Sequence, residues 1–134
     1  MPGILEIEKE SISPPWTHGG LLSEMHSSDA YFALALEGST ILGFIVLRRM
    51  ADESELLQIA VGKVHRRQGA ACKLVKDALN WARSNDISTI YLEVRKSNKA
   101  AIALYKKHCF KEAGQRKNYY TEPVEDALIM VKRL

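Results

Sequence analysis

The chain has 134 residues, a length that fits one domain over residues 1–134 that folds without disulfides or a metal. A net charge of +3 with scattered basic residues does not indicate a nucleic-acid-binding surface. The two cysteines and four histidines form no metal-binding spacing, so no metal site is expected. With no recognisable leader and no long apolar segment, we expect a cytoplasmic protein without membrane contact.

The first half of the chain predicts a short irregular start followed by antiparallel strands. Residues 5–9 begin a helical pattern that Pro14 and Pro15 interrupt, and residues 23–28 form a short helix or a loop. Two apolar runs, residues 31–36 and 41–47, flank the turn Glu37-Gly38-Ser39-Thr40 and predict a hairpin. The polar turn of residues 52–55 then leads into a third strand.

The second half predicts a crossover. The nearly all-apolar run of residues 56–61 is typical of a strand buried on both faces. A helix follows, with one apolar face made by Ala71, Leu74, Val75, Ala78, Leu79 and Ala82. Asn85-Asp86 ends it, and residues 87–94 read as a strand. Two strands that flank a helix in this way are expected to be parallel.

After this crossover, Ser97 offers an N-cap for a second helix that runs to about Lys107. Residues 110–120 and 127–131 then predict a closing hairpin around Thr121-Glu122-Pro123. The whole pattern predicts an α/β (α+β) domain with a mixed, mostly antiparallel central sheet.

The turn between the crossover strand and its helix has the composition of an anion site. Its sequence is Arg66-Arg67-Gln68-Gly69-Ala70-Ala71. The first N–H groups of a helix lack intrahelical partners, and the helix dipole adds positive charge there, so a phosphate or pyrophosphate is well satisfied. Gly69 lets the backbone approach such a ligand. An ordinary basic helix start explains the same residues when the motif stands alone.

Downstream motifs make a family resemblance specific. The order of elements with R-x-x-G-x-A at the turn resembles the GCN5-related N-acetyltransferase (GNAT) superfamily. The run L-E-V-R-x-S-N-x-x-A-x-x-L-Y over residues 92–105, residues 116–120, residues 125–127 and Pro15-Trp16 resemble its ribosomal-protein-alanine N-acetyltransferases of the RimI type. The resemblance extends from Trp16 to Met130 and implies a sheet whose parallel strands splay apart at the acetyl-CoA site.

The resemblance implies acetyl-CoA as co-substrate and assigns residues to it. The backbone of Gln68, Gly69, Ala70 and Ala71 would hold the pyrophosphate, with charge from Arg66 and Arg67. Three strand residues, Ile59, Ala60 and Val61, would face the acetyl-pantetheine arm. Asn98 would hydrogen-bond that arm, although taken alone it is a capping residue.

Two further residues receive catalytic roles from the resemblance. Glu93 would be the general base toward the substrate ammonium, and Tyr105 the general acid for the coenzyme A thiolate. From the residues alone, Glu93 also fits a salt-bridged structural carboxylate, and Tyr105 fits a core residue of an amphipathic helix.

For the acceptor, the resemblance implies a protein N-terminus, such as that of a ribosomal protein. An α-amino group titrates near ~8 and lysine near ~10.4, so an α-amine needs less help to lose its proton. Tyr119 and Tyr120 precede the final turn, where related enzymes grip the acceptor. Adjacent strand residues point to opposite faces, so we expect at most one tyrosine to line the site. The alternatives are acetylation of lysine or a small-molecule amine, and a non-catalytic acetyl-CoA-binding module.

The chain departs from the family pattern in two places. His108-Cys109 stands where Leu-Gly is usual, so the helix loses the glycine that favours a left-handed C-terminal turn. Only fourteen residues precede Pro15-Trp16, too few for the family's first strand and longer first helix. We therefore expect the first strand to be missing and residues 31–36 to form an exposed edge, open to pairing in a dimer.

Overall fold

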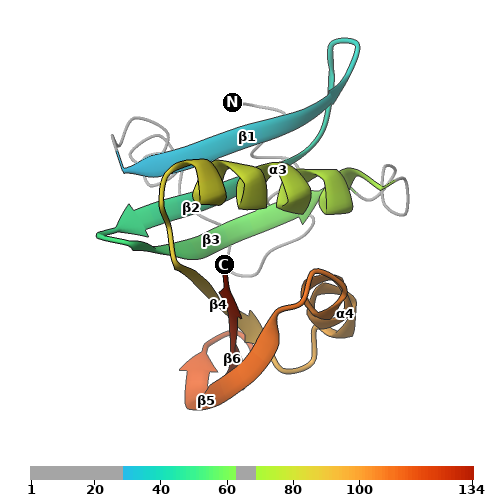
Figure 1. Ribbon diagram of the computed structural model, residues 1–134. Helices are drawn as coiled ribbons and strands as arrows, with labels where there is room; N and C mark the ends of the chain where they lie inside the picture. Colours follow the sequence, from blue (N-terminus) through green and yellow to red (C-terminus); the bar gives the residue numbers. More distant parts are fainter. Residues whose placement is uncertain (1–28, 63–68) are drawn as a thin grey trace.

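The computed structural model describes residues 29–62 and 69–134, which form one sheet and two helices (Figure 1). The elements in chain order are β1 (Ala30–Glu37), β2 (Thr40–Met50), β3 (Glu53–Val61), α3 (Ala70–Ser84), β4 (Thr89–Arg95), α4 (Lys99–Lys107), β5 (Lys111–Tyr120) and β6 (Glu125–Arg133). The expected first hairpin, crossover and closing hairpin are all present. The predicted loss of the family's first strand concerns residues outside the described part.

The six strands form a single sheet in the order β1-β2-β3-β4-β6-β5. Only β3 and β4 pair in parallel, and α3 connects them, whereas every other neighbouring pair is antiparallel. This confirms the mixed, mostly antiparallel sheet predicted from the sequence. The return strand β6 lies between β4 and β5, so the parallel pair sits in the interior of the sheet.

Helix α3 forms because its apolar residues recur on one face. The buried residues of this face are Ala70, Leu74, Val75, Ala78, Leu79 and Ala82, and the helix contacts β1, β2 and β3. Tyr31 of β1 stacks on Trp81 with the ring centroids 4.9 Å apart. At the end of the helix, the Asn85 side chain donates to the Trp81 carbonyl at 2.8 Å. Asp86 follows at φ 58°, which turns the chain toward β4.

Helix α4 begins one residue later than predicted. Its N-cap is Asn98, whose Oδ1 accepts a hydrogen bond from the Ala101 N–H at 3.1 Å. Ser97 was therefore the wrong N-cap, and its own N–H donates to Glu125 Oε2 at 2.7 Å. An amide oxygen at the N-cap satisfies one of the N–H groups that the first turn leaves without an intrahelical partner.

The other end of α4 is a left-handed turn made without glycine. Cys109 has φ 70°, its N–H bonds the Lys106 carbonyl at 3.0 Å, and the Phe110 N–H bonds the Tyr105 carbonyl at 3.0 Å. These two bonds are the pattern of a Schellman motif, in which glycine is the usual left-handed residue. Cys109 therefore takes the left-handed conformation in place of the usual glycine, and the turn is kept.

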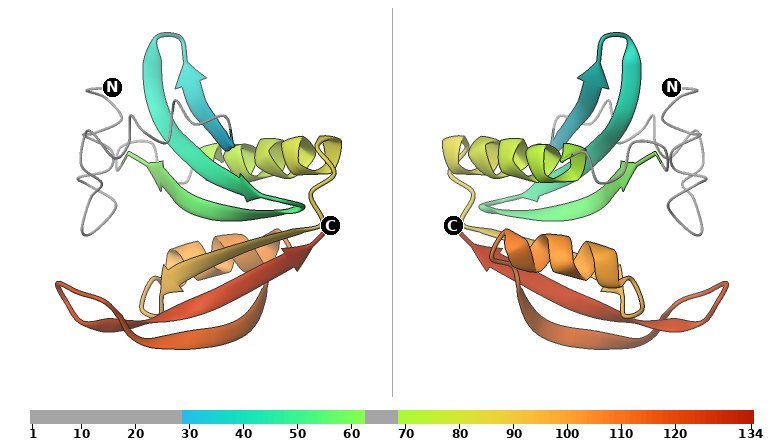
Figure 2. Two further views of the ribbon diagram at one scale, coloured as in Figure 1. Left: turned by 90° about the vertical axis from the view of Figure 1, so that its left-hand side faces the viewer. Right: turned by 90° about the vertical axis from the view of Figure 1, so that its right-hand side faces the viewer.

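One apolar core lies under both helices. It joins residues of α3 and α4, including Leu74, Leu79 and Tyr105, with Leu92 of β4 and Met130 of β6. Figure 2 shows α3 against the β1–β3 part of the sheet and α4 against the part that contains β4 and β6. Both helices thus cover the same face, and the opposite face carries a second apolar contact, the stacked rings of Phe32 and Phe44.

One prediction about the approach to β3 was wrong in detail. The strand starts at Glu53, so the expected polar turn of residues 52–55 is reduced to a turn at residues 51–52. The strand does have buried residues on both faces: Leu56 lies in the core under the helices, whereas Gln58 and Ala60, beyond a register shift against β2, are buried on the other face. The early start places Glu55 inside the sheet instead of in a loop.

Among the described strands, β1 and β5 form the two edges of the sheet. β5 is exposed along nearly its whole length and carries mostly polar residues. β1 carries two exposed leucines, Leu34 at 40% and Leu36 at 57% exposure. Residues 31–36 therefore lie in an edge strand of the described part of the sheet, with most of that strand half-buried.

Candidate active site

The parallel strands pair over only part of their length. The last partners are Leu56 of β3 and Leu92 of β4, although β3 continues to Val61 and β4 to Arg95. Beyond this point β3 stays paired with β2 and β4 stays paired with β6. Figure 2 shows the two strands diverging from their closed end near the C-terminus. We call this region the β3–β4 opening.

At one wall of the β3–β4 opening, the backbone of β2 lies very close to that of β3. Gly43 of β2 lies opposite Val61, and a Cβ at Gly43 would sit 2.5 Å from the Ala60 carbonyl oxygen. No side chain fits there without moving the backbone. Beyond Leu56, β3 has no partner among the described strands on its β4 side. Over this stretch it is held by β2 on its other side.

The register directs several polar side chains to the sheet face away from the helices. Leu56 and Leu92 belong to the core under the helices, so their neighbours point to the other face. These neighbours include Glu55 on β3 and Glu93 on β4. Both carboxylates therefore lie on one face, next to the closed end of the opening.

Each of these carboxylates has an arginine partner. Glu93 Oε2 lies 2.9 Å from Arg116 Nε, an ion pair that is not aligned as a hydrogen bond. Glu55 Oε1 lies 3.6 Å from Arg48 Nη2. The Glu93 side chain is 13% exposed and that of Arg116 57%. Glu93 is thus an ion-paired carboxylate, as its alternative interpretation from the sequence allowed, and it lies beside the opening.

The two carboxylates influence each other. Burial and the nearby negative charge of Glu93 raise the pKa of Glu55, although the Arg48 and Arg116 guanidinium groups act in the opposite direction. Burial is the larger cause, so the shift shows that the folded protein disfavours the charged form of Glu55. A cation placed beside this carboxylate, for example a substrate ammonium, would lower that cost.

Tyr119 and Tyr120 face the same region, which corrects the expectation from strand alternation. Their rings meet edge to face with centroids 5.1 Å apart, an arrangement that opposite faces of a strand do not allow. The pairing of β5 with β6 is irregular between Arg116 and Tyr120, and Asn118 has φ 52°. This local irregularity breaks the alternation, so both tyrosines lie on one side.

Besides burial, the charge of the Glu93 carboxylate raises the pKa of both tyrosines. Burial and the charge of Glu93 raise the pKa of Tyr119, and a hydrogen bond to Glu93 adds to the shift. Burial first and then Glu93 raise the pKa of Tyr120 to about 12. At neutral pH both phenols therefore keep their protons and can act as hydrogen-bond donors in this region.

Tyr105 lies on the inner side of α4. It is 5% exposed and packs against Phe110 with ring centroids 5.8 Å apart. Burial raises its pKa strongly, and Tyr120 adds to the shift. The side chain is therefore both a core residue and a protonated phenol close to the hairpin tyrosines.

Arg95 ties the turn of the β5–β6 hairpin to the end of β4. Its Nη1 donates to the Pro123 carbonyl at 2.9 Å and its Nη2 to the Thr121 carbonyl at 2.9 Å. It also pairs with Glu125 at 3.3 Å and lies over the Tyr120 ring at 4.5 Å. The hydrogen bond with Ser97 and the Arg95 charge hold the pKa of Glu125 below its usual value. The hairpin is thereby held beside the opening.

The start of α3 carries the described part of the predicted anion turn. Gly69 is its N-cap with φ 80°, a conformation that favours glycine, and a Cβ there would meet open space. Ala70 and Ala71 open the helix as predicted. Arg66, Arg67 and Gln68 lie outside the described residues. On β3, Ala60 is buried while Ile59 and Val61 are half-buried.

Sequence reasoning missed Glu55, Arg48 and the burial of Gln58 on β3. In the sequence analysis Glu55 was placed in a turn. Extending the strand pattern of residues 56–61 back to Glu53 would have placed Glu55 on the strand.

Within residues 29–62 and 69–134, no three His, Cys, Asp or Glu side chains are grouped as a metal site. No helix in the same part is long and apolar enough to cross a membrane.

Comparison with known proteins gives one family. Residues 1–110 match the model of the "Acetyltransferase (GNAT) family". The [ribosomal protein bS18]-alanine N-acetyltransferase of Escherichia coli K12 is 35% identical over 132 residues, 97% of this chain and 88% of that protein. A Bacillus subtilis protein described as a putative enzyme of the same kind is 33% identical over 128 residues, covering 95% and 85%.

Solved structures agree with these sequence matches. The E. coli ribosomal-protein-S18-alanine N-acetyltransferase superposes with a TM-score of 0.91 at 32% identity, over 98% of this chain and 86% of that chain. Ard1 from Thermoplasma volcanium superposes with a TM-score of 0.94 at 26% identity, over 99% and 90%. The chain therefore belongs to the GNAT family and is an acetyl-CoA-dependent N-acetyltransferase.

Proposed function

We propose that this protein transfers the acetyl group of acetyl-CoA to the α-amino group of a protein N-terminus, in the manner of the ribosomal-protein-alanine enzymes. The observation that carries the proposal is Glu93, a nearly buried carboxylate at the β3–β4 opening with Tyr119, Tyr120 and Arg116 around it. The names of the relatives from E. coli and B. subtilis support the same acceptor class.

In the proposed reaction Glu93 is the general base. The acceptor enters as an ammonium, which the carboxylates of Glu55 and Glu93 attract to this face of the sheet. Glu93 takes one proton, directly or through water, and the amine attacks the thioester carbonyl. The C–N bond forms, the C–S bond breaks, and the leaving thiolate takes a proton from Tyr105, the general acid. The nitrogen loses its second proton as the amide forms, and this proton, passed through water, restores Tyr105. The raised pKa of Tyr105 keeps that proton in place until the thiolate forms.

The cofactor assignments follow the two sides of the opening. We propose that Arg66, Arg67 and the backbone of residues 68–71 bind the pyrophosphate at the start of α3. The β3 residues Ile59, Ala60 and Val61 would line the acetyl-pantetheine arm, and Asn98 would donate to it from the start of α4. Because Gly69 takes a left-handed φ of 80°, the turn can present consecutive N–H groups to one ligand.

The proposed partner is the N-terminus of a ribosomal protein, which would place the reaction in the cytoplasm. Tyr119 and Tyr120 would bind the first residues of this acceptor, because both phenols lie on the Glu93 side of the hairpin. The exposed β1 edge is the surface we propose for contact between two copies, so the protein would be a monomer or a dimer.

A direct assay tests the proposal. The protein is incubated with acetyl-CoA and peptides that start with Ala, Ser or Met, and with an N-terminally blocked peptide that has an internal Lys. Mass spectrometry then locates the acetyl group. Acetylation at α-amines is expected. Acetylation of lysine alone, or of small amines alone, would contradict the acceptor assignment, and binding of acetyl-CoA without turnover would indicate a non-catalytic module.

Two substitutions test the catalytic roles. Glu93→Gln removes the base and is expected to lower kcat by about 10²- to 10⁴-fold, and Tyr105→Phe by about 10²-fold. Glu112→Gln on the exposed face of β5 and Tyr31→Phe against α3 are matched controls that should leave kcat near the wild-type value. Wild-type kcat in Glu93→Gln would contradict the mechanism.

A further inference from the structure

Gln58 is a buried side chain with unmet hydrogen-bonding capacity. It is 4% exposed, and neither its Nε2 nor its Oε1 has a hydrogen-bond partner among residues 29–62 and 69–134. Burying an amide without partners is unfavourable, because the group gives up its bonds to water. A side chain of this kind is better explained by a ligand that completes its bonds than by a contribution to stability.

The register places Gln58 in the β3–β4 opening on the side of the carboxylates. It lies two residues beyond Leu56, the last residue of β3 that pairs with β4. The β2–β3 register shifts between these two residues, because Leu47 lies opposite Leu56 and the adjacent Val46 lies opposite Gln58, so Gln58 does not share the face of Leu56. Its partner on β2 is Val46, and Val46 points away from the helices because Ile45 and Leu47 point into the core beneath them. Directly opposite residues share a face, so Gln58 shares the face of Glu93 across the opening.

The face of the sheet on which Gln58 lies indicates that its ligand is the acceptor and not the cofactor. The start of α3, where the pyrophosphate is proposed to bind, belongs to the helix-covered face. Gln58, Glu55 and Glu93 belong to the other face. An acceptor that approaches from this face has its amine at Glu93 and its next atoms along the opening, toward Gln58.

We infer that the Gln58 amide binds the first peptide unit of the acceptor and so selects an N-terminal α-amine over the side-chain amine of lysine. The inference rests on the proposed function. In an N-terminal residue a single carbon separates the amine from a carbonyl, and an N–H follows, so the amide can donate to one and accept from the other. A lysine amine is followed by four methylene groups, which leave the Gln58 amide buried without partners and so weaken binding.

The test compares Gln58→Met with the wild type, and with Gln115→Met on the exposed surface of β5 as a matched control. Methionine keeps the size and removes both hydrogen-bonding atoms. We expect KM for the peptide with a free N-terminus to rise about tenfold or more, KM for acetyl-CoA to stay unchanged, and the preference for α-amine over internal lysine to fall by a similar factor. The melting temperature of the free protein should equal or exceed that of the wild type, and Gln115→Met should match the wild type throughout.

Each other result overturns the inference in a recognisable way. A lower melting temperature with unchanged kinetics would make Gln58 a structural residue. A raised KM for acetyl-CoA alone would make it a cofactor contact. An unchanged α-to-lysine preference in an active enzyme would remove the inference and leave the proposed function standing, whereas a wild type that acetylates no α-amine would remove both.

Discussion

At the scale of single residues, the site is defined by two carboxylates on neighbouring strands. Glu93 has Arg116 at 2.9 Å and Glu55 has Arg48 at 3.6 Å. Glu93 is the better candidate for the base because the phenols of Tyr119 and Tyr120 gather around it. Glu55 contributes negative charge beside it, and that charge has a cost in stability.

The cost at Glu55 can be measured through its pH dependence. A carboxyl group whose pKa is raised by folding favours the folded state while protonated, and loses this contribution as the pH rises from its ordinary value of 4.5 through its folded value. Glu55→Gln is neutral at every pH. We therefore expect its melting temperature, relative to wild type, to increase between pH 4 and pH 7, about the range in which a raised carboxyl pKa falls.

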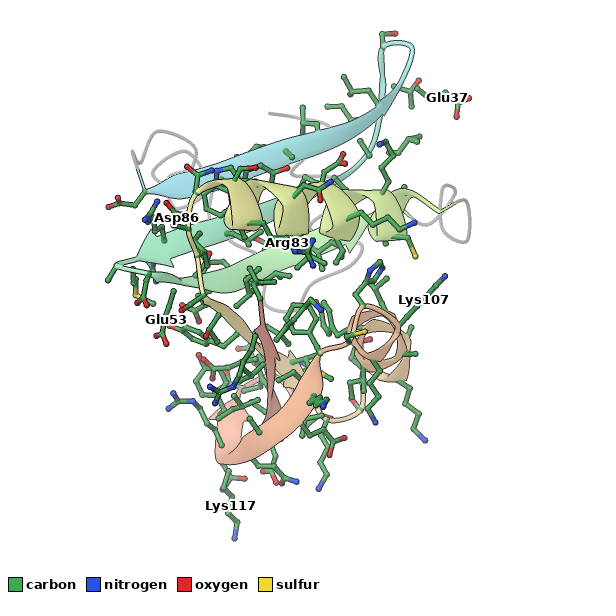
Figure 3. The ribbon with its side chains drawn as sticks, viewed as in Figure 1. Glu37, Glu53, Arg83, Asp86, Lys107 and Lys117 are labelled. Carbon is green, nitrogen blue, oxygen red and sulfur yellow. The ribbon has the colours of Figure 1, made fainter. Side chains whose placement is uncertain are left out.

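Thermal unfolding across this pH range, with Glu53→Gln as control, checks the expectation. Glu53 lies on the same strand and is exposed, at the start of β3 and pointing outward in Figure 3. A difference between Glu55→Gln and wild type that stays constant with pH would contradict the raised pKa of Glu55.

Cys109 offers a second prediction at this scale. A left-handed φ of 70° costs an L-residue about 1–2 kcal/mol, whereas glycine loses about 0.5–1 kcal/mol through its freer unfolded chain. Cys109→Gly should therefore raise the free energy of unfolding by about 1 kcal/mol. Urea unfolding measures this free energy. The variant Cys109→Ala keeps the Cβ and should show no such gain in stability. Equal stability of the two variants would contradict the backbone explanation.

At the scale of elements, the β5–β6 hairpin depends on β4 for its position. The irregular stretch between Arg116 and Tyr120 turns both tyrosines to one side. Arg95 then holds the turn through the carbonyls of Thr121 and Pro123. The tyrosines are thus placed by contacts with another element more than by the periodicity of their own strand.

Arg95→Met tests this dependence. Losing hydrogen bonds from a charged group is expected to lower the free energy of unfolding by about 2 kcal/mol, and to raise KM for the peptide more than KM for acetyl-CoA. Lys117→Met is the control, because Lys117 points away from the molecule at the end of the hairpin in Figure 3. A variant with wild-type stability and wild-type KM for the peptide would show that the hairpin is positioned without Arg95.

At the scale of the whole molecule, the sheet is one body that opens between β3 and β4. Each strand keeps its outer partner, so the opening is built into the fold. One core under α3 and α4 joins the parts of the sheet on both sides of it. A ligand bound across this opening contacts both parts and should stabilise the folded protein as a whole.

Acetyl-CoA should therefore raise the melting temperature. At one hundred times its Kd a ligand adds about 2.7 kcal/mol, which corresponds to about 5 °C or more for a domain of this size. Acetyl-pantetheine, which lacks the pyrophosphate, should give a much smaller shift. Replacing Arg66 and Arg67 by Gln should reduce the acetyl-CoA shift toward that of acetyl-pantetheine. Equal shifts for wild type and this variant would contradict the proposed anchor.

The fold could be predicted from the chain to a large extent because its cues are local. The apolar face of α3, the hairpin turn at Gly38 and the crossover from β3 to β4 each depend on the periodicity or turn chemistry of neighbouring residues. Glu93 at the end of a strand and Tyr105 on a helix face were found in this way. The resemblance then supplied their proposed roles.

Only the tertiary structure decided how side chains of distant segments meet. Pairing register put Glu55 beside Glu93, brought Arg116 to 2.9 Å from that carboxylate, and left Gln58 buried without partners among the described residues. Backbone irregularities at Asn118 and Cys109 overrode what strand alternation and glycine preference predict. Periodicity is a property of one segment, whereas register and bulges result from packing between segments. The order of the elements could therefore be read along the chain, and the shape of the site could not.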